Sequence, residues 1–303
     1  MALYLAIFFI PVIYCLMTLR MSSAYQVGFL FLYVFGLGVF VGIGDMLGGY
    51  DRYIYGELFD RTADDLAAGV PFYQTTVFLQ YPSEVGYDML NVIVALFSSN
   101  RYIFILVVTL LIYTSLFISF SRYISNPSFA LVLFFGLMFF FTFTYLRQIL
   151  GVSIVWHAIV YVQRRKFVPF AVIVILAASF HNSLLLFFPF YFLPLRKFQK
   201  QNVLYVMAAC FIFGVIGPSG ALFSAFGGMS GDTERAAMYA DDTSGFRLAY
   251  MMEASFFLFI IMQNYDQLGQ GRLNTVLLNM SLAFCGVLFF FIRSENGGRL
   301  SWC

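Results

Sequence analysis

Long apolar runs separated by short polar segments constrain this chain more than any other feature of its sequence. Most of them approach the roughly 20 residues that a helix needs to cross the hydrocarbon core of a bilayer. Only 11% of the residues are charged, against about 25% in soluble domains, and strands of alternating polarity are not evident. We therefore predict an all-α integral membrane protein. The strong runs cover residues 2–19, 27–44, 102–119, 128–145, 149–163, 203–219, 248–264 and 273–292.

Two further apolar stretches are irregular. Residues 86–98 are too short to span and favour a re-entrant or interfacial helix. Residues 167–195 are interrupted at His181, Asn182 and Ser183, so we expect a hairpin of two short helices that turns at His181. The sequence thus predicts a polytopic transmembrane helical bundle, a single integral membrane domain over residues 1–303. Its two outward loops would cover about residues 45–101 and 220–247.

The distribution of charge predicts the orientation of this bundle. With these assignments, one side carries nine basic residues and one acidic residue, and the other carries eight basic and fourteen acidic residues. By the positive-inside rule the first side faces the cytoplasm. Every outward base is an arginine, whose planar fork suits phosphate and carboxylate. The inward bases are Arg20, Arg122, Arg164, Arg165, Lys166, Arg196, Lys197, Lys200 and Arg272.

The first outward segment begins with a mixture of acid, base and aromatic side chains that suits a sugar. Asp51 and Arg52 offer polar partners for hydroxyls, and Tyr53 and Tyr55 offer faces for ring stacking. For Asp51 a structural role is equally open. The remaining acidic residues favour an ordinary solvated surface: Glu57, Asp60, Asp64 and Asp65.

Glu84 stands directly before the short helix expected over residues 86–98, and Tyr87 follows it closely. A carboxylate at the N-terminal end of a helix is stabilised by the helix dipole, which is a sufficient structural reason for it. The same position would also hold a general base at the membrane surface. The sequence leaves both interpretations open.

Arg147 and His181 are the polar residues most at odds with their apolar surroundings. An arginine between two apolar helices is costly unless it is paired or faces a wet cavity, so we favour a functional role for Arg147. His181 and its polar neighbours can cap two helix ends, but a histidine there can also exchange a proton with a polar ligand. His157, in the middle of a run, is expected to be an ordinary core histidine.

Several classes of function are disfavoured. The chain has no P-loop, dinucleotide-binding, zinc-protease or serine-hydrolase motif. Its four cysteines lack metal-ligand spacing, so we expect no metal or other cofactor. A net charge of +2 gives no indication of a nucleic-acid partner. Near the end of the sequence, Arg293 and Arg299 beside Gly297 and Gly298 would suit a phosphate-bearing headgroup.

Taken in order, four segments resemble the EpsG family, relatives of the Wzy-type bacterial polymerases that make O-antigen and exopolysaccharide. The resemblance runs from about Gly49 to Tyr191 and rests on GYDRYIYGELF, EVGYDMLN, YLRQILGVSIVWHAIVYVQRRKF and LAASFHNSLLLFFPFYF. Here FHNS stands where relatives more often have FHYS. Relatives usually continue for another span or two beyond Cys303, so the resemblance implies that this chain lacks a C-terminal part.

The resemblance implies a GT-C-like membrane glycosyltransferase of the bacterial inner membrane whose active face points outward. Its substrates would be undecaprenyl-diphosphate-linked oligosaccharides, which serve as both donor and acceptor. They would reach the site from the membrane lipid, and no nucleotide sugar would be used. Matched position by position, the resemblance singles out Asp51, Glu84, Tyr87, Arg147, His181 and Arg299.

These residues give a mechanistic hypothesis and two competitors. Arg147, with Arg293 or Arg299, would hold the diphosphate leaving group, and His181 or Glu84 would deprotonate the attacking hydroxyl. A transporter or flippase of a lipid-linked glycan is the first competitor, although such proteins usually carry polar groups near the midplane. The second is a non-catalytic subunit acting with other polysaccharide-assembly proteins.

Overall fold

A computed structural model describes residues 2–18, 23–44, 49–217 and 245–293, and these residues form helices and connecting turns without any strand. They fall into two compact units. The first comprises Met1–His157 with Ser179–His181, and the second comprises Ala158–Ala178 with Asn182–Cys303.

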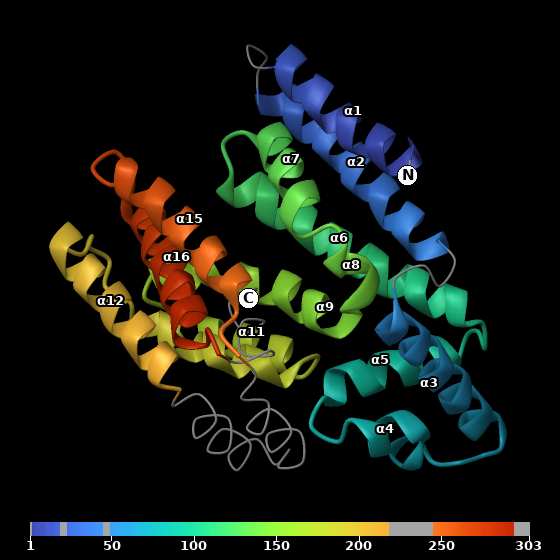
Figure 1. Ribbon diagram of the computed structural model, residues 1–303. Coiled ribbons are helices and arrows are strands. Elements are labelled where there is room, and N and C mark those ends of the chain that lie inside the picture. The colour runs from blue at the N-terminus through green and yellow to red at the C-terminus, as the bar shows by residue number, and fades with distance from the viewer. Residues whose placement is uncertain (1, 19–22, 45–48, 218–244, 294–303) are drawn as a thin grey trace. The chain divides into compact units, whose positions relative to one another are not determined.

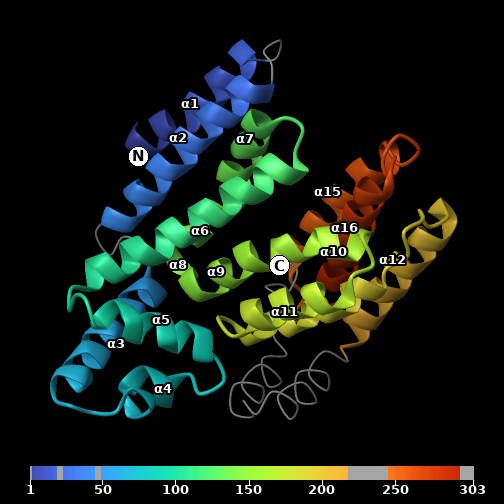
Figure 2. The ribbon, with the colours of Figure 1, turned by 180° about the vertical axis from the view of Figure 1, so that it is seen from behind.

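The first unit is built around α2 (Ser23–Ile43) and α6 (Arg101–Tyr123), which pack along each other (Figures 1 and 2). α1 (Ala2–Thr18) lies against α7 (Pro127–Leu137), and α9 (Leu146–Val155) lies against α6. The side chain of Asn100 caps α6 by accepting a hydrogen bond from the Tyr102 amide. A continuous core of aliphatic and aromatic side chains joins these helices.

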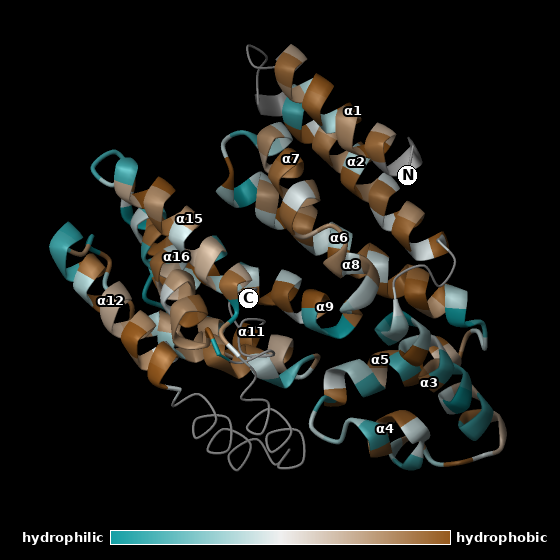
Figure 3. Cartoon of the chain, in the orientation of Figure 1, coloured by the Kyte–Doolittle hydropathy of each residue, from teal (hydrophilic) through white to brown (hydrophobic). Residues whose placement is uncertain are grey.

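Within the described part of the chain, four helices are long and apolar enough to cross a membrane, namely Tyr25–Ile43, Arg101–Tyr123, Leu146–Gln163 and Arg272–Phe290. Figure 3 shows the apolar character of α2, α6 and α16 (Arg272–Phe290). Large apolar side chains on α2 and α6 point outward rather than into the core, including Leu32, Phe35 and Leu111. A helix that exposes such residues is suited to lipid, so this is a membrane protein.

The apolar run 128–145 is not one continuous helix, contrary to the expectation of a single span. It divides into α7 and the four-residue α8 (Phe141–Thr144). Thr142 accounts for part of the break, because its Oγ1 donates to the Phe139 carbonyl at 2.6 Å and also contacts the Tyr113 hydroxyl. A threonine that binds a nearby carbonyl competes with the helical hydrogen-bond pattern.

The predicted outward loop 45–101 is largely folded into helices in its described part. α3 (Tyr50–Ala67), a short 3₁₀ turn at Phe72–Gln74, α4 (Thr76–Gln80) and α5 (Val85–Ala95) gather beyond the ends of α2 and α6, as both views show (Figures 1 and 2). Its acidic residues mostly have structural partners. Asp65 accepts from the amide and hydroxyl of Thr76 at 2.7 Å, and Asp60 pairs with Arg101.

The second unit contains α16 packed against α12 (Lys200–Ile216) and α15 (Leu248–Gln263). α11 (Phe167–Ala178) and the 3₁₀ helix η3 (Asn182–Phe192) pack together on either side of the break at residues 179–181. This is the helical hairpin expected from the interrupted run. Most of the predicted loop 220–247 lies outside the described residues.

Candidate functional site

Three polar side chains predicted separately from the sequence meet in the first unit. Glu84 is 2% exposed and lies between the other two. Its Oε2 pairs with Nη1 of Arg147, and its Oε1 lies 2.8 Å from Nδ1 of His181. The side chains of Arg147 and His181 are 10% and 25% exposed. Both carboxylate oxygens of Glu84 are thus engaged, while the histidine ring is the member most open to its surroundings.

Three tyrosine rings surround the Arg147 guanidinium. Its central carbon lies 3.6 Å from the ring centroid of Tyr81, 5.3 Å from that of Tyr55 and 5.5 Å from that of Tyr87. All three rings are buried, and cation–π attraction is strongest where water is excluded. Burial raises the pKa of the Tyr55 and Tyr87 phenols, so both remain protonated. The arginine is therefore fixed in place by one carboxylate and three aromatic faces.

Helix termini explain why Glu84 and Arg147 need each other. Arg147 is the second residue of α9, where a positive charge opposes the helix dipole. Glu84 is the N-cap of α5, but its side chain makes no capping hydrogen bond. The carboxylate thus pairs with Arg147 and His181 instead of capping its own helix. A purely local role for Glu84, which the sequence left open, does not account for these contacts.

A main-chain contact brings His181 to Glu84. The Ser179 carbonyl accepts hydrogen bonds from the amides of Gly86 at 2.8 Å and Tyr87 at 3.2 Å at the start of α5, and the Tyr87 amide also donates to the Glu84 carbonyl at 2.9 Å. Glycine is needed at position 86 because a Cβ would overlap Oγ of Ser179 and lie 3.1 Å from its Cβ and its carbonyl oxygen. The break at 179–181 therefore docks directly onto the N-terminus of α5.

The arrangement can hold a histidine ready to accept a proton. If Nδ1 carries a hydrogen donated to Glu84, the neutral ring presents a lone pair at Nε2. The Glu84 carboxylate then stabilises the imidazolium that forms when Nε2 takes up a proton, as in other histidine–carboxylate pairs. Among the described residues, no group of three or more histidine, cysteine, aspartate or glutamate side chains is placed to hold a metal ion.

Sequence reasoning overlooked Asp88 and Asn91, which continue the buried polar face of α5. Both are 0% exposed. The amide nitrogen of Asn91 donates to the Tyr87 carbonyl at 2.9 Å, whereas neither carboxyl oxygen of Asp88 has a hydrogen-bond partner among the described residues. The four-residue spacing from Glu84 was the available signal, because it places both acids on one helix face. The apolar residues around Asp88 obscure this spacing in the sequence.

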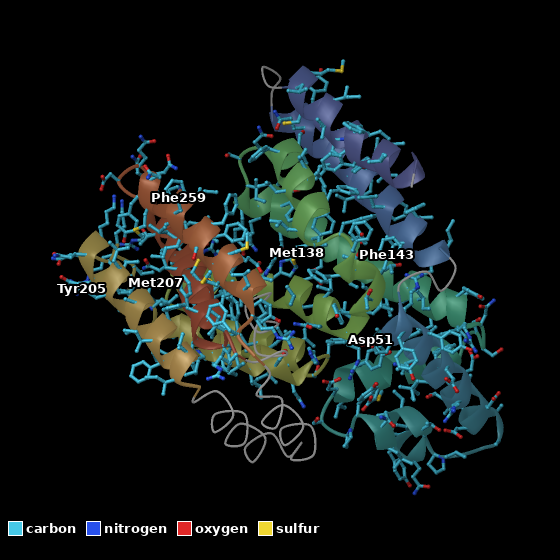
Figure 4. All side chains as sticks on the ribbon, viewed as in Figure 1. Asp51, Met138, Phe143, Tyr205, Met207 and Phe259 are labelled. Atoms are coloured by element: carbon cyan, nitrogen blue, oxygen red, sulfur yellow. The ribbon has the colours of Figure 1, made fainter. Side chains whose placement is uncertain are left out.

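The other predicted site residues are placed differently. Asp51 lies in the first turn of α3 (Figure 4). This helix packs against α8. Arg52 is fully buried, and its Nη2 donates to the carbonyls of Val41 at 2.6 Å and Gly44 at 2.9 Å, which fastens α3 to the end of α2. In the second unit, Arg293 is exposed and donates to the Val215 carbonyl. Arg299 lies outside the described residues.

His157, the other histidine of the chain, has an ordinary structural environment. Its Nε2 lies 2.8 Å from Oγ of Ser115, which also donates to the Ser153 carbonyl at 2.8 Å. It thus helps fasten α6 to the end of α9, as expected for a core histidine.

The model of the EpsG family matches residues 29–303, which is most of the chain and includes every residue of the site described above. Comparisons with curated proteins and with solved structures found no match.

Proposed function

Because this chain belongs to the EpsG family, a Wzy-like family of polysaccharide polymerases, we propose that it joins undecaprenyl-diphosphate-linked oligosaccharide repeat units into a surface polysaccharide. The reaction would occur at the outer face of the bacterial inner membrane, with one lipid-linked chain as donor and another as acceptor. The observation that carries this proposal is the buried Glu84 carboxylate held between Arg147 and His181.

His181 is the general base in this mechanism. Its ring is the most exposed member of the group, whereas Glu84 is buried with both oxygens engaged. Nε2 takes the proton of an acceptor hydroxyl as that oxygen attacks the anomeric carbon of the donor. The bond from that carbon to the diphosphate oxygen breaks, and the diphosphate leaves on its lipid carrier. A positioned base of this kind contributes about 10²- to 10⁴-fold to a rate.

Glu84 and Arg147 act through His181 in this proposal. Glu84 fixes the tautomer and orientation of the ring, and Arg147 fixes Glu84. This role differs from the expectation that Arg147 holds the diphosphate, since its guanidinium contacts Glu84 and three tyrosine rings and its side chain is only 10% exposed. For the leaving diphosphate, Arg293 and Arg299 stay a prediction made from the sequence alone.

The tyrosines and Asp51 would contact the sugars. Tyr53 is half exposed on α3, and its ring face can stack on a sugar ring. Asp51 can accept hydrogen bonds from hydroxyl groups. The diphosphate is already a good leaving group, so positioning of two lipids and neutralisation of developing negative charge would supply most of the catalysis.

The experiment is a gel of surface polysaccharide from a strain that lacks this gene. Complementation with the wild-type chain is expected to restore a long-chain ladder, and complementation with His181→Ala at equal protein level is expected to give single repeat units. Single units that never reach the surface would instead indicate transport of the lipid-linked glycan. An unchanged ladder in the deletion strain would contradict the proposed function.

A further inference from the structure

The buried face of α5 carries an acid that the mechanism above does not use. Asp88 follows Glu84 by one helical turn and is 0% exposed. Neither of its carboxyl oxygens has a hydrogen-bond partner among the described residues. An ionised carboxylate without partners is very costly to bury, and such a group takes up a proton instead.

The charges around Asp88 point in the same direction. The Glu84 carboxylate opposes ionisation of the Asp88 carboxyl group, whereas the Arg147 guanidinium favours it. The guanidinium of Arg147 is paired with Glu84, and the N-terminal end of α5 already has the Glu84 carboxylate beside it. A second negative charge would have to share one cation with Glu84.

Among the described residues, the elements packed around α5 add aromatic rings and His181 but no further charge that acts on Asp88. α3 contributes Tyr55, the end of α4 contributes Tyr81, and both rings lie beside Tyr87 on α5. α6 contributes the Phe104 ring, also against Tyr87. The segment 179–181 contributes His181, which is bound to Glu84.

We propose that Asp88 is a positioning residue of this site that works in its neutral, protonated form, leaving Arg147 wholly to Glu84. Loss of the Asp88 proton would set two neighbouring carboxylates in competition for one guanidinium. Arg147 would then be drawn between them, and the orientation of Glu84 toward His181 would be lost. The inference rests on the proposed function, because the residue acts on the proposed general base.

Burial and the neighbouring Glu84 raise the pKa of Asp88 to about 8. Wild-type activity is therefore expected to fall on the alkaline side. One pH unit above the pKa, only about one tenth of the protein keeps the proton, so turnover at about pH 9 should be about tenfold lower than at about pH 7.

The test measures polymer formed from purified lipid-linked repeat units by the full chain in detergent or liposomes, from about pH 6 to about pH 10. Asn reproduces the shape of a neutral Asp but has no proton to lose. We expect Asp88→Asn to abolish the fall between about pH 7 and about pH 9, while Asp64→Asn, which removes a carboxylate from the exposed face of α3, should keep the wild-type profile. The same alkaline fall in Asp88→Asn would overturn the inference.

A second measurement does not depend on activity. Infrared spectra of the purified protein titrated over the same range are expected to show a protonated-carboxyl band that disappears with a midpoint near 8 and is missing from Asp88→Asn. A wild-type spectrum without a band that Asp88→Asn removes would also overturn the inference. Failure of the wild-type chain to form polymer at any pH, with the band present, would count against the proposed function and leave the protonation of Asp88 established.

Discussion

Glu84 and His181 lie 97 residues apart in the sequence, yet Oε1 of Glu84 is 2.8 Å from Nδ1 of His181. Because of this contact, two residues that are weak candidates in the sequence belong to one candidate site. A carboxylate before a short helix and a histidine at a helical turn each have ordinary structural explanations. Their meeting, with Arg147 on the second carboxylate oxygen, is not required by either explanation.

His181 is the most direct point of test, because the chain has a second histidine to compare with it. His181→Gln removes the proton-accepting nitrogen at similar size and is expected to lower polymer formation by about 100-fold or more. His157→Gln, at a core position that contacts Ser115, is expected to stay within a few-fold of wild type at equal protein level. Equal losses in the two variants would remove the case for His181 as the base.

Glu84 and Arg147 should be coupled in stability but not in activity. Glu84→Gln leaves a buried guanidinium without its anion, and Arg147→Met leaves a buried carboxylate without its cation, so each should lose about 3–5 kcal/mol of unfolding free energy. The double variant Glu84→Gln/Arg147→Met is expected to regain much of that stability and to remain inactive. Thermal unfolding in detergent and the polysaccharide ladder provide the two readouts, and additive losses of stability would show that the pair is not formed.

Gly86 is expected to be critical because of the close approach of Ser179. In Gly86→Ala the Ser179 hydroxyl can rotate away from the new Cβ. The Cβ and the carbonyl oxygen of Ser179, each 3.1 Å from that new Cβ, must shift, and His181 moves with them. We expect a loss of activity of about tenfold or more from such a displacement. Gly36→Ala is the matched control, since a Cβ on that helical glycine of α2 meets nothing within 4 Å; an equal effect there would point to general instability.

Arg52 should behave as a structural residue. Its Nη2 bridges two carbonyls at the end of α2, so Arg52→Met should leave buried carbonyls unpaired and cost about 1–3 kcal/mol. Polymer formed per folded molecule is expected to change little. Substrate titration checks this, because a weakened apparent affinity with unchanged stability would instead support the sugar-binding role expected from the sequence.

The stability of the protein should also depend on pH through Asp88. Its pKa in the folded state, about 8, is higher than the value of about 3.9 in an unfolded chain, so the folded state binds more protons between these two values. The stabilisation of the folded state by the proton on Asp88 is complete below about pH 4 and is lost as the pH rises toward 8. The melting temperature of Asp88→Asn relative to wild type should therefore rise across this window. A constant difference would contradict the raised pKa.

The sequence predicted the helical class, which the structure confirms, and it named the three side chains that meet in the candidate site, since apolar runs and isolated polar residues are local signals. The meeting of Glu84, Arg147 and His181 could not be derived from it, because the meeting depends on how the Ser179 carbonyl docks on α5. The division of residues 128–145 was missed for a related reason. The length of an apolar run does not indicate that the Thr142 hydroxyl binds the Phe139 carbonyl.

The assignment of Arg52 shows the opposite difficulty. Its neighbours in sequence, an aspartate and two tyrosines, resemble a sugar-binding surface. In the fold the Arg52 side chain is buried and donates to two carbonyls at the end of α2. Composition over a few residues does not tell which side of a helix each residue occupies until the helix is packed.

The spacing of the site along the chain has a consequence for how the protein is made. Glu84 leaves the ribosome 63 residues before Arg147 and 97 before His181. Until those segments are inserted, the Glu84 carboxylate has neither partner and must stay hydrated or protonated. The site is thus completed late in biogenesis, after α9 and the break that follows α11 are in place. Enzymatic competence would then report that the whole first unit has been assembled in the bilayer.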